Sequence, residues 1–441
     1  MNEASGRVFL FLQGPHGPFF RDLALEMARL GAKVRRVAFN AADEAEWQAA
    51  GPLDRYVGPE ASYAAWLVRY LSLHWVTDIV LYGDSRPEHA QAIDLARARG
   101  IRCHCLEEGY LRPHWATYER GGSNGNSLLN EIGLDRIMRA LGPCEPPAEQ
   151  VPDRWGSHRA HMWHSARYYL RLLMPSRAYG RYRSRRSRGL WAELGLYLSR
   201  LASLPLRRAA QGFQVWRLLA AGRTYNLALL QLSFDSAMQF HSPYRCSAEF
   251  VADCVAGFAA GAAPDELLVF KAHPFEDGRE RLGRVIADEA AHHGVAGRVL
   301  FLDGGNGLSA LLDGARSVVT VNSTAGQQAL WRGLPVAALG DAVYARPGLT
   351  SDQPLARFFA APRPPRQAHY WAFRQFLIQT SQLRGSFYSE AGIDELLATL
   401  PQAMLAPLDP YETLLAETGA AAPAVAPIPR PQAAELRLAV G

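Results

Sequence analysis

Three short motifs bring together the residue types that bind a phosphate and move a proton. They are Glu107-Glu108-Gly109, Lys271-Ala272-His273-Pro274 and Asn322-Ser323-Thr324-Ala325-Gly326. Each motif follows a short apolar run that predicts a β-strand, and open α/β sheets bind ligands at the carboxyl ends of their strands. The sequence therefore predicts a site built from carboxylates, hydroxyls and cations at strand ends.

Ser323 and Thr324 are the first candidates for binding a phosphate. They lie between a predicted strand and a helix that opens at Ala325, where free N–H groups and the helix dipole attract an anion. An ordinary helix N-cap is the alternative, because Ser and Thr are preferred there in any helix. Lys271 and His273 end another strand two residues apart, so they point the same way and can hold a phosphate or stabilise it as a leaving group. A solvated histidine before a strand-ending proline is the alternative.

Glu107 and Glu108 are the candidates for general acid–base chemistry. Adjacent carboxylates repel, which raises the pKa of one of them, and Gly109 allows a tight turn after the pair. Two solvated loop acids are the alternative. Asp235 lies just past the first strand of the second half, in Gln231-Leu-Ser-Phe-Asp-Ser236, where an acid suits a nucleophile beside an interdomain cleft. Its alternative role is to cap the next helix.

Three further loops follow predicted strands and hold weaker candidates. His16 and Gly17 lie in the first loop, and Asp84 and Arg86 lie in the second, Gly83–Pro87. Such residues serve more often in turns than as ligands. Arg112 follows the acidic pair and can be presented to a carboxylate.

The elements that must position these residues form two βα series. In the first 110 residues, apolar runs at 8–12, 33–39, 78–82 and 101–106 alternate with helical patterns, which predicts a parallel, doubly wound sheet. A second series has strand candidates at 227–232, 267–271, 299–302, 317–321 and 335–338. The fold class is therefore α/β, with two Rossmann-like domains facing a cleft.

The chain of 441 residues is too long for one ordinary core. We expect an N-terminal domain at 1–150, a basic and aromatic helical segment at 151–223, and a C-terminal domain at 224–400. An amphipathic helix at 367–379 can fold back across the domains. The Ala/Pro-rich residues 401–441 predict a mobile tail.

Composition narrows the class of protein. No apolar run approaches the roughly 20 residues of a membrane helix, and the first residues lack a signal-peptide pattern, so we expect a cytoplasmic protein. The five cysteines match no zinc or disulfide framework, and we expect no metal and no cofactor. Arginines cluster between Arg177 and Arg208 among Trp and Tyr residues, which suits docking on an anionic membrane. A brace between the domains is the alternative, and no fold motif indicates a nucleic acid partner.

Seven stretches together resemble the KpsS-type capsular polysaccharide β-Kdo transferases. They are Gln13–Phe20, Gly83–Pro87, Glu107–Pro113, Leu230–Ser236, His241–Ser242, His273–Pro274 and Asn322–Gly326. They occur in the family's order between residue 11 and about residue 350. The resemblance implies a GT-B fold, peripheral to the inner membrane. It also implies retaining transfer of Kdo from CMP-β-Kdo to phosphatidylglycerol or lysophosphatidylglycerol, beside other capsule proteins such as the transferase that extends the poly-Kdo linker.

The same resemblance assigns roles to individual residues. Asp235 matches the nucleophile that attacks C2 of Kdo and expels CMP, and Glu108 or Glu107 matches the acid/base. His273, Ser323 and Thr324 match the CMP phosphate binders. The other donor-site residues are Gln231, Lys271, Pro274, Asn322 and Gly326, and the acceptor or sugar contacts are His16, Gly17, Asp84, Arg86, Arg112 and His241. Phe234 stands where much of the family has Asn, which leaves the positioning of Asp235 to another residue such as Gln231.

Two rival functions remain at this point. A transferase for CMP-sialic acid would invert and use Glu108 alone, and a donor screen separates it from a Kdo transferase. A capsule-assembly scaffold would keep the fold without catalysis, and turnover by the purified protein excludes it.

Overall fold

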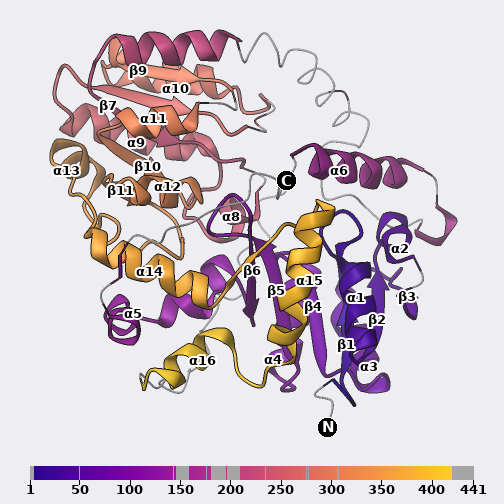
Figure 1. The fold of residues 1–441 in the computed structure, drawn as a ribbon. Coiled ribbons are helices and arrows are strands. Elements are labelled where there is room, and N and C mark those ends of the chain that lie inside the picture. Colours follow the sequence, from indigo (N-terminus) through magenta and orange to yellow (C-terminus); the bar gives the residue numbers. More distant parts are fainter. Residues whose placement is uncertain are drawn as a thin grey trace.

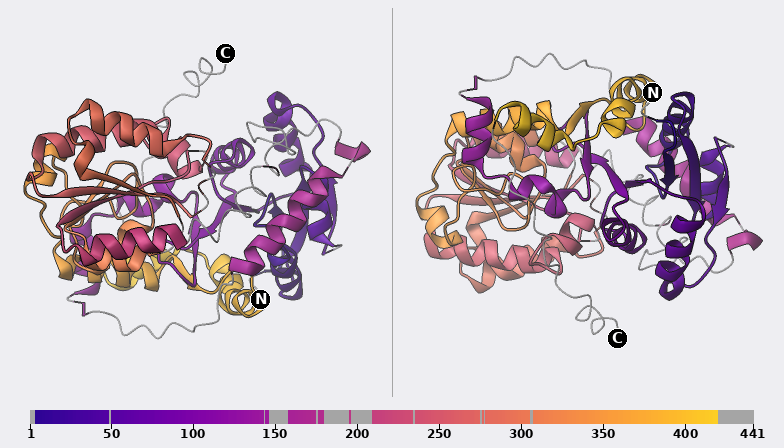
Figure 2. Two further views of the ribbon diagram at one scale, coloured as in Figure 1. Left: turned by 90° about the horizontal axis from the view of Figure 1, so that it is seen from above. Right: turned by 90° about the horizontal axis from the view of Figure 1, so that it is seen from below.

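Two α/β domains lie side by side in the computed structural model (Figures 1 and 2). The structure describes residues 4–48, 50–142, 144–145, 158–174, 176–179, 195, 209–233, 235–274, 276, 278–304 and 307–419. Each domain is built around one sheet, and the two strand orders are β12-β6-β5-β4-β1-β2-β3 and β11-β10-β7-β8-β9. The predicted pair of parallel-sheet domains is therefore confirmed.

The first sheet forms where the sequence has its apolar runs. Its parallel strands are β1 (Val8–Phe11), β2 (Lys33–Ala38), β3 (Leu53–Arg55), β4 (Asp78–Tyr82) and β5 (Arg102–Glu108). β6 (Trp115–Arg120) pairs antiparallel with β5, and its register sets Glu107 opposite Thr117 and Glu108 opposite Ala116. The helices of this half are α1 (Phe19–Arg29), α2 (Ala41–Trp47), α3 (Tyr63–Leu73), α4 (Pro87–Arg97) and α5 (Leu134–Leu141). α1 covers one face of the sheet and α3 and α4 cover the other.

The second sheet is parallel throughout. Its strands are β7 (Tyr225–Leu229), β8 (Leu267–Lys271), β9 (Val299–Leu302), β10 (Ser317–Thr320) and β11 (Val336–Ala338). Its helices are α8 (Ser236–Phe240), α9 (Ser247–Gly261), α10 (Leu282–His292), α11 (Leu308–Gly314), α12 (Ala325–Trp331) and α13 (Leu355–Ala360). Short 3-10 helices lie at Glu60–Ser62, Asn124–Asn126, Leu128–Glu131, Arg177–Tyr179 and Ala296–Arg298. All five predicted strands are present, so each predicted motif does follow a strand.

The end of the chain returns to the first domain, which corrects the predicted boundary at residue 400. α14 (Gln367–Gln379) packs on α5, and β12 (Gln382–Arg384) then pairs antiparallel with β6. α15 (Glu390–Leu405) buries Leu396, Leu400 and Met404 in the core beside α1. α16 (Pro410–Glu417) follows with a capping box at Asp409. The prediction of a mobile tail is wrong for residues 401–419, because the three prolines at 401, 407 and 410 hid the end of one helix and the start of another, both with buried faces. Residues 420–441 lie outside the description.

The predicted basic segment is attached to both domains by its described ends. α6 (His158–Leu173) lies over α2, where the Tyr168 hydroxyl contacts Asn40 and donates to Asp43 Oδ1 at 2.9 Å. Residues 209–220 are helical, and Val215 and Leu218 join the core of the second domain. The arginines from Arg181 to Arg208 lie outside the described residues. Within the part of the chain that is described, no helix has the length and apolar character to span a membrane.

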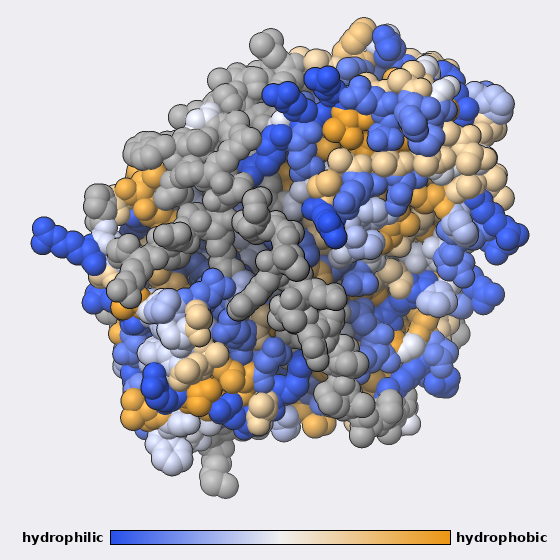
Figure 3. Space-filling view, turned by 180° about the vertical axis from the view of Figure 1, so that it is seen from behind, coloured by the Kyte–Doolittle hydropathy of each residue, from blue (hydrophilic) through white to orange (hydrophobic). Residues whose placement is uncertain are grey.

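On the face opposite to that of Figure 1, hydrophilic side chains are interspersed with smaller hydrophobic groups wherever the residues are described (Figure 3). α6 carries the more distinctive apolar surface. Trp163 is 66% exposed and Leu170 is 62% exposed, and the two lie about two helical turns apart on the same face.

Candidate active site

The strand-end loops of the two domains meet at His241. This residue ends α8 in the second domain, is 4% exposed, and places Nε2 3.2 Å from Ser85 Oγ and 4.0 Å from Asp84 Oδ1 of the first domain. A side chain at Gly125 would collide with the His241 ring, so glycine lets the two loops approach. Asp84 also accepts from the Ser123 N–H and from Asn126 Nδ2, both at 2.9 Å. Asp84 and His241 therefore join the domains and fix one wall of the cleft.

Glu107 lies on that wall among other acids. Burial raises the pKa of Glu107 from 4.5 to about 8, and the negative charges of Asp84, Asp235 and Glu108 add to the effect. The Glu108 N–H, which donates to Glu107 Oε1 at 3.3 Å, offsets only part of this. Glu107 is therefore mostly protonated at neutral pH and responds to the charge of Asp235 from the other domain. The repulsion predicted for the adjacent acids is present, but Asp84 and Asp235 contribute more to it than Glu108 does.

Glu108 points the other way, because successive side chains on a strand leave opposite faces. Glu108 Oε1 accepts from the Tyr82 hydroxyl at 3.3 Å, and the Tyr82 and Tyr388 hydroxyls lie 3.3 Å apart. Burial, and then the Glu108 carboxylate, raise the pKa of Tyr388 well above its ordinary value. The Tyr388 ring stacks on His161 of α6 with centroids 4.0 Å apart. Of the two acids that the sequence leaves as alternatives, the one grouped with Asp235 is Glu107.

Asp235 occupies the N-cap position of α8 without using its side chain as a cap. Its backbone carbonyl accepts from the N–H groups of Met238 and Gln239, each at 3.0 Å, whereas the carboxylate makes no capping hydrogen bond. The residue is exposed. An acid that begins a helix but leaves its carboxylate uncommitted is available for other chemistry.

Lys271 is the predicted donor-site residue that the structure turns inward. Its side chain is buried, and Nζ donates to the carbonyls of Ala272 at 3.2 Å and Gly304 at 2.9 Å. Burial lowers the pKa of Lys271 to about 8. Lys271 therefore ties the loops after β8 and β9 together, and its predicted role beside His273 on a phosphate stays a prediction.

His273 faces positive charge instead. Burial, then the Arg112 guanidinium and Lys271, lower the pKa of His273 to about 4, so the imidazole is neutral at pH 7. Arg112 is exposed, and its Nε donates to the Gly109 carbonyl at 3.2 Å. Pro274 follows His273 and is exposed. A guanidinium beside a neutral imidazole favours an anionic ligand, because an anion would offset the positive charge of Arg112 that adds to the effect of burial.

Gln231 and Asn322 bind one another. Gln231 Nε2 donates to Asn322 Oδ1 at 2.8 Å, and the Asn322 N–H donates to Gln231 Oε1 at 2.9 Å. Asn322 Nδ2 donates to the carbonyls of Ala237 at 2.7 Å and His241 at 2.8 Å. The pair therefore positions α8, whose N-cap is Asp235 and whose C-cap is His241, and its predicted donor contact stays a prediction.

Ser323 and Thr324 differ in how they relate to the two alternatives given for them, phosphate binding and capping of the following helix. Ser323 Oγ accepts from the Ala325 N–H at 3.2 Å, and its carbonyl accepts from the Tyr344 hydroxyl, so Ser323 supports the start of α12. Thr324 makes no side-chain cap. It lines a small interdomain pocket that also includes Asn124 and Asn322. Gly326 is needed for packing, because a side chain there would collide with Tyr344.

The first strand-end loop is covered by α6. His16 Nδ1 lies 3.0 Å from Ser165 Oγ, and its ring stacks on Tyr168 with centroids 4.1 Å apart. The Gly17 N–H donates to Glu46 Oε1 at 2.8 Å, and Arg86 Nη1 donates to Gln13 Oε1. His16 therefore holds α6 on the domain, Gly17 and Arg86 bind Glu46 and Gln13 of the same domain, and none of these contacts groups the three with Glu107 and Asp235.

Sequence reasoning missed three polar residues beside the site. Ser85 was read only as part of a loop, Tyr388 lies in the returning segment, and Gln327 lies in α12 next to the hydroxyl motif. Gln327 is 3% exposed, and neither side-chain polar atom has a hydrogen-bond partner among the described residues. Only Gln327 carries a usable signal, namely a polar residue on the inner face of a short predicted helix.

Comparison with known proteins identifies the family. Residues 77–388 match the model of the family described as capsule polysaccharide biosynthesis protein. The chain belongs to this family. It is 32% identical over 387 residues to the capsule polysaccharide export protein KpsS of Escherichia coli, an alignment that covers 87% of this chain and 97% of that protein. It is 29% identical over 398 residues to the capsule polysaccharide modification protein LipB of Neisseria meningitidis serogroup B, covering 88% of this chain and 93% of that protein. The family indicated by the sequence motifs is confirmed.

Among solved structures, the chain aligns with Thermosulfurimonas dismutans KpsC, beta Kdo 2,7 transferase. The sequence identity is 13% and the TM-score is 0.43, with 89% of this chain and 99% of that chain covered.

Proposed function

We propose that this capsule-family protein is a glycosyltransferase that moves Kdo from CMP-β-Kdo to phosphatidylglycerol or lysophosphatidylglycerol, with retention. The observation that carries the proposal is the pairing of Glu107 with Asp235 across the domains, one protonated and one exposed and uncommitted. Two carboxyl groups held in different protonation states are what a two-step displacement requires. The motif resemblance supplies the identity of the sugar and the lipid, and cytoplasmic work at the inner membrane follows from that acceptor.

In the first displacement, an oxygen of the Asp235 carboxylate attacks C2 of the sugar. The C2–O bond to the phosphate breaks, its electron pair leaves with CMP, and a glycosyl ester of Asp235 forms. The growing negative charge on the phosphate is met by the Arg112 guanidinium, the His273 imidazole N–H and the Thr324 hydroxyl. No proton needs to reach the leaving phosphate, which departs as an anion.

The second displacement needs a base, and the first step prepares it. Forming the ester removes the negative charge of Asp235, one of the charges that raise the pKa of Glu107. Glu107 then releases its proton to solvent more readily. Its carboxylate takes the proton of the acceptor hydroxyl as that oxygen attacks C2 and the ester bond to Asp235 breaks. Two inversions at C2 give retention.

A donor screen tests the proposal. Purified full-length protein is incubated with a short-chain lysophosphatidylglycerol and either CMP-Kdo or CMP-sialic acid. The mass of the lipid product is then measured by mass spectrometry. The proposal predicts addition of one Kdo with CMP-Kdo and no product with CMP-sialic acid. Product with CMP-sialic acid alone would replace the proposal with the sialyl-type function. If neither donor gave a product or released CMP, the result would favour a non-catalytic scaffold.

A further inference from the structure

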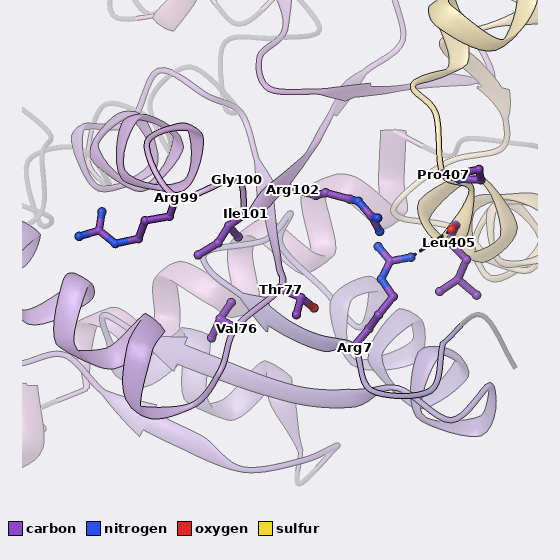
Figure 4. A pocket seen from close by; sticks show the side chains of 9 residues that line it. All are labelled: Arg7, Val76, Thr77, Arg99, Gly100, Ile101, Arg102, Leu405 and Pro407. Carbon is purple, nitrogen blue, oxygen red and sulfur yellow. Dashed lines mark hydrogen bonds between the residues drawn. The ribbon is translucent and has the colours of Figure 1, made fainter. Parts of the chain in front are cut away.

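A second hollow lies at the opposite end of the first sheet from the candidate active site. It has a volume of about 540 Å³ and is lined by Arg7, Val76, Thr77, Arg99, Gly100, Ile101, Arg102, Leu405 and Pro407 (Figure 4). Arg102 begins β5, whereas Glu107 and Glu108 end it, so the length of the strand separates the hollow from the acids. The hollow is therefore not part of the proposed donor site.

The hydrogen bonding of Arg7 leaves the hollow with net positive charge. Arg7 Nε donates to Asp78 Oδ2 at 3.0 Å, and Asp78 also receives His104 Nε2 at 2.9 Å. Burial lowers the pKa of His104, so this histidine is neutral and the Arg7–Asp78 pair balances itself. No other carboxylate belongs to the lining, which leaves the charges of Arg99 and Arg102 uncompensated there.

Arg102 is the group that faces an occupant. Its guanidinium and that of Arg7 point toward one another across the hollow, whereas Arg99 points away from it (Figure 4). Arg7 is held by Asp78 and by the last carbonyls of α15, at Met404 and Leu405. The Arg102 guanidinium makes no hydrogen bond or ion pair with any described residue. Burial, and then the positive charge of Arg7, lower the pKa of Arg102, and the opposing charge of Asp78 offsets only part of this.

We propose that this hollow is a phosphate-binding site in which Arg102 and Arg7 hold one phosphate group. Arg102 offers its guanidinium to the phosphate, and Arg7 adds the Nη1 N–H that the Leu405 carbonyl does not use, because its Nε and Nη2 groups are already bound. A charge-assisted contact of this kind is stronger than a neutral hydrogen bond. Val76, Ile101, Leu405 and Pro407 form an apolar wall beside the phosphate position, where the rest of a phosphorylated molecule can pack. The site is independent of the proposed transferase function.

Titration of the full-length protein with inorganic phosphate tests the site. Isothermal calorimetry should show saturable binding in the millimolar range that weakens at least roughly tenfold in Arg102→Gln. Arg99→Gln is the matched control: it removes the same charge from the same lining, but its guanidinium points away, so affinity should fall less than about threefold. Both arginines are exposed, so circular dichroism of the variants should match the parent protein.

A second arm distinguishes the sources of the phosphate. If Arg102→Gln also weakens sedimentation with phosphatidylglycerol vesicles, the site takes a lipid headgroup; if sedimentation is unchanged, it takes soluble phosphate compounds. Absence of saturable phosphate binding, or equal affinity in the parent protein and Arg102→Gln, would overturn the proposal. CMP affinity should be the same in both proteins, so failure here is separate from failure of the proposed function.

Discussion

The sharpest prediction separates the two adjacent acids by replacing each with glutamine. Glu107 is grouped with Asp84 and Asp235, and its pKa is raised from 4.5 to about 8, which shifts its ionisation by roughly 5 kcal/mol toward the protonated form relative to a free carboxyl. Glu108 is held by Tyr82 on the other side of the strand. We expect Glu107→Gln to lower kcat by roughly 10²–10⁴, the usual contribution of a general base. Glu108→Gln should cost less than about tenfold.

The pH dependence gives the same prediction a second readout. Because Glu107 must be ionised in the second displacement, when Asp235 no longer adds to its raised pKa, kcat should rise with pH with a midpoint below the value of about 8 that holds before the ester forms. Asp84→Asn removes one of the charges that raise the pKa of Glu107, so the rise should move to lower pH by about one unit. Asparagine can still accept from the Ser123 N–H, which keeps the loop in place.

The assay is Kdo transfer to a short-chain lysophosphatidylglycerol, followed by mass spectrometry over a pH series. A rate for Glu107→Gln equal to that of the parent protein, together with a large loss in Glu108→Gln, would refute the assignment. A kcat profile with no ionisation below about pH 8, or one that Asp84→Asn leaves in place, would refute the electrostatic explanation.

Three further predictions concern other parts of the molecule. His273→Ala should weaken CMP binding about tenfold by calorimetry, because the imidazole lies beside Arg112; unchanged affinity in this variant and in the Ser323/Thr324 double alanine variant would put the phosphate elsewhere. Burial raises the pKa of Glu119 to about 8, so its contribution to stability is complete below about pH 4.5 and is lost as pH rises through 8; Glu119→Gln should flatten the fall in Tm between pH 6 and 9 relative to the parent protein. Trp163→Glu should reduce sedimentation with anionic vesicles, whereas Trp75→Glu, at an exposed tryptophan outside α6, should not; equal sedimentation of Trp163→Glu and the parent protein would contradict docking through α6.

The strand ends were predictable from the sequence because their signals are local. Apolar runs before Glu107, Lys271 and Asn322 place those residues at strand ends without reference to the rest of the chain. Which way a side chain turns there depends on neighbours distant in sequence. Lys271 turns inward and donates to the Gly304 carbonyl, and Asn322 donates to the His241 carbonyl at the end of α8. Neither partner is evident from the spacing of residues in the sequence.

Contacts between the domains were the hardest to foresee. His241 meets Ser85 only because Gly125 leaves room for its ring, and these positions are far apart in the chain. The return of α15 to the first domain was missed because Pro401 lies inside the helix and an alanine-rich sequence follows it. Long-range packing, and not local propensity, decided both features.

Trapping the glycosyl ester tests the central claim most directly. Glu107→Gln keeps Asp235 but lacks the base for the second displacement, so incubation with CMP-Kdo should increase the intact protein mass by one Kdo residue, and peptide mapping should place it on Asp235. The double variant Glu107→Gln/Asp235→Asn should gain no mass, whereas Glu107→Gln/Asp265→Asn, which removes an exposed acid at the far end of β8, should still be labelled. Labelling that persists in the Asp235→Asn variant, or that maps to another residue, would contradict the account.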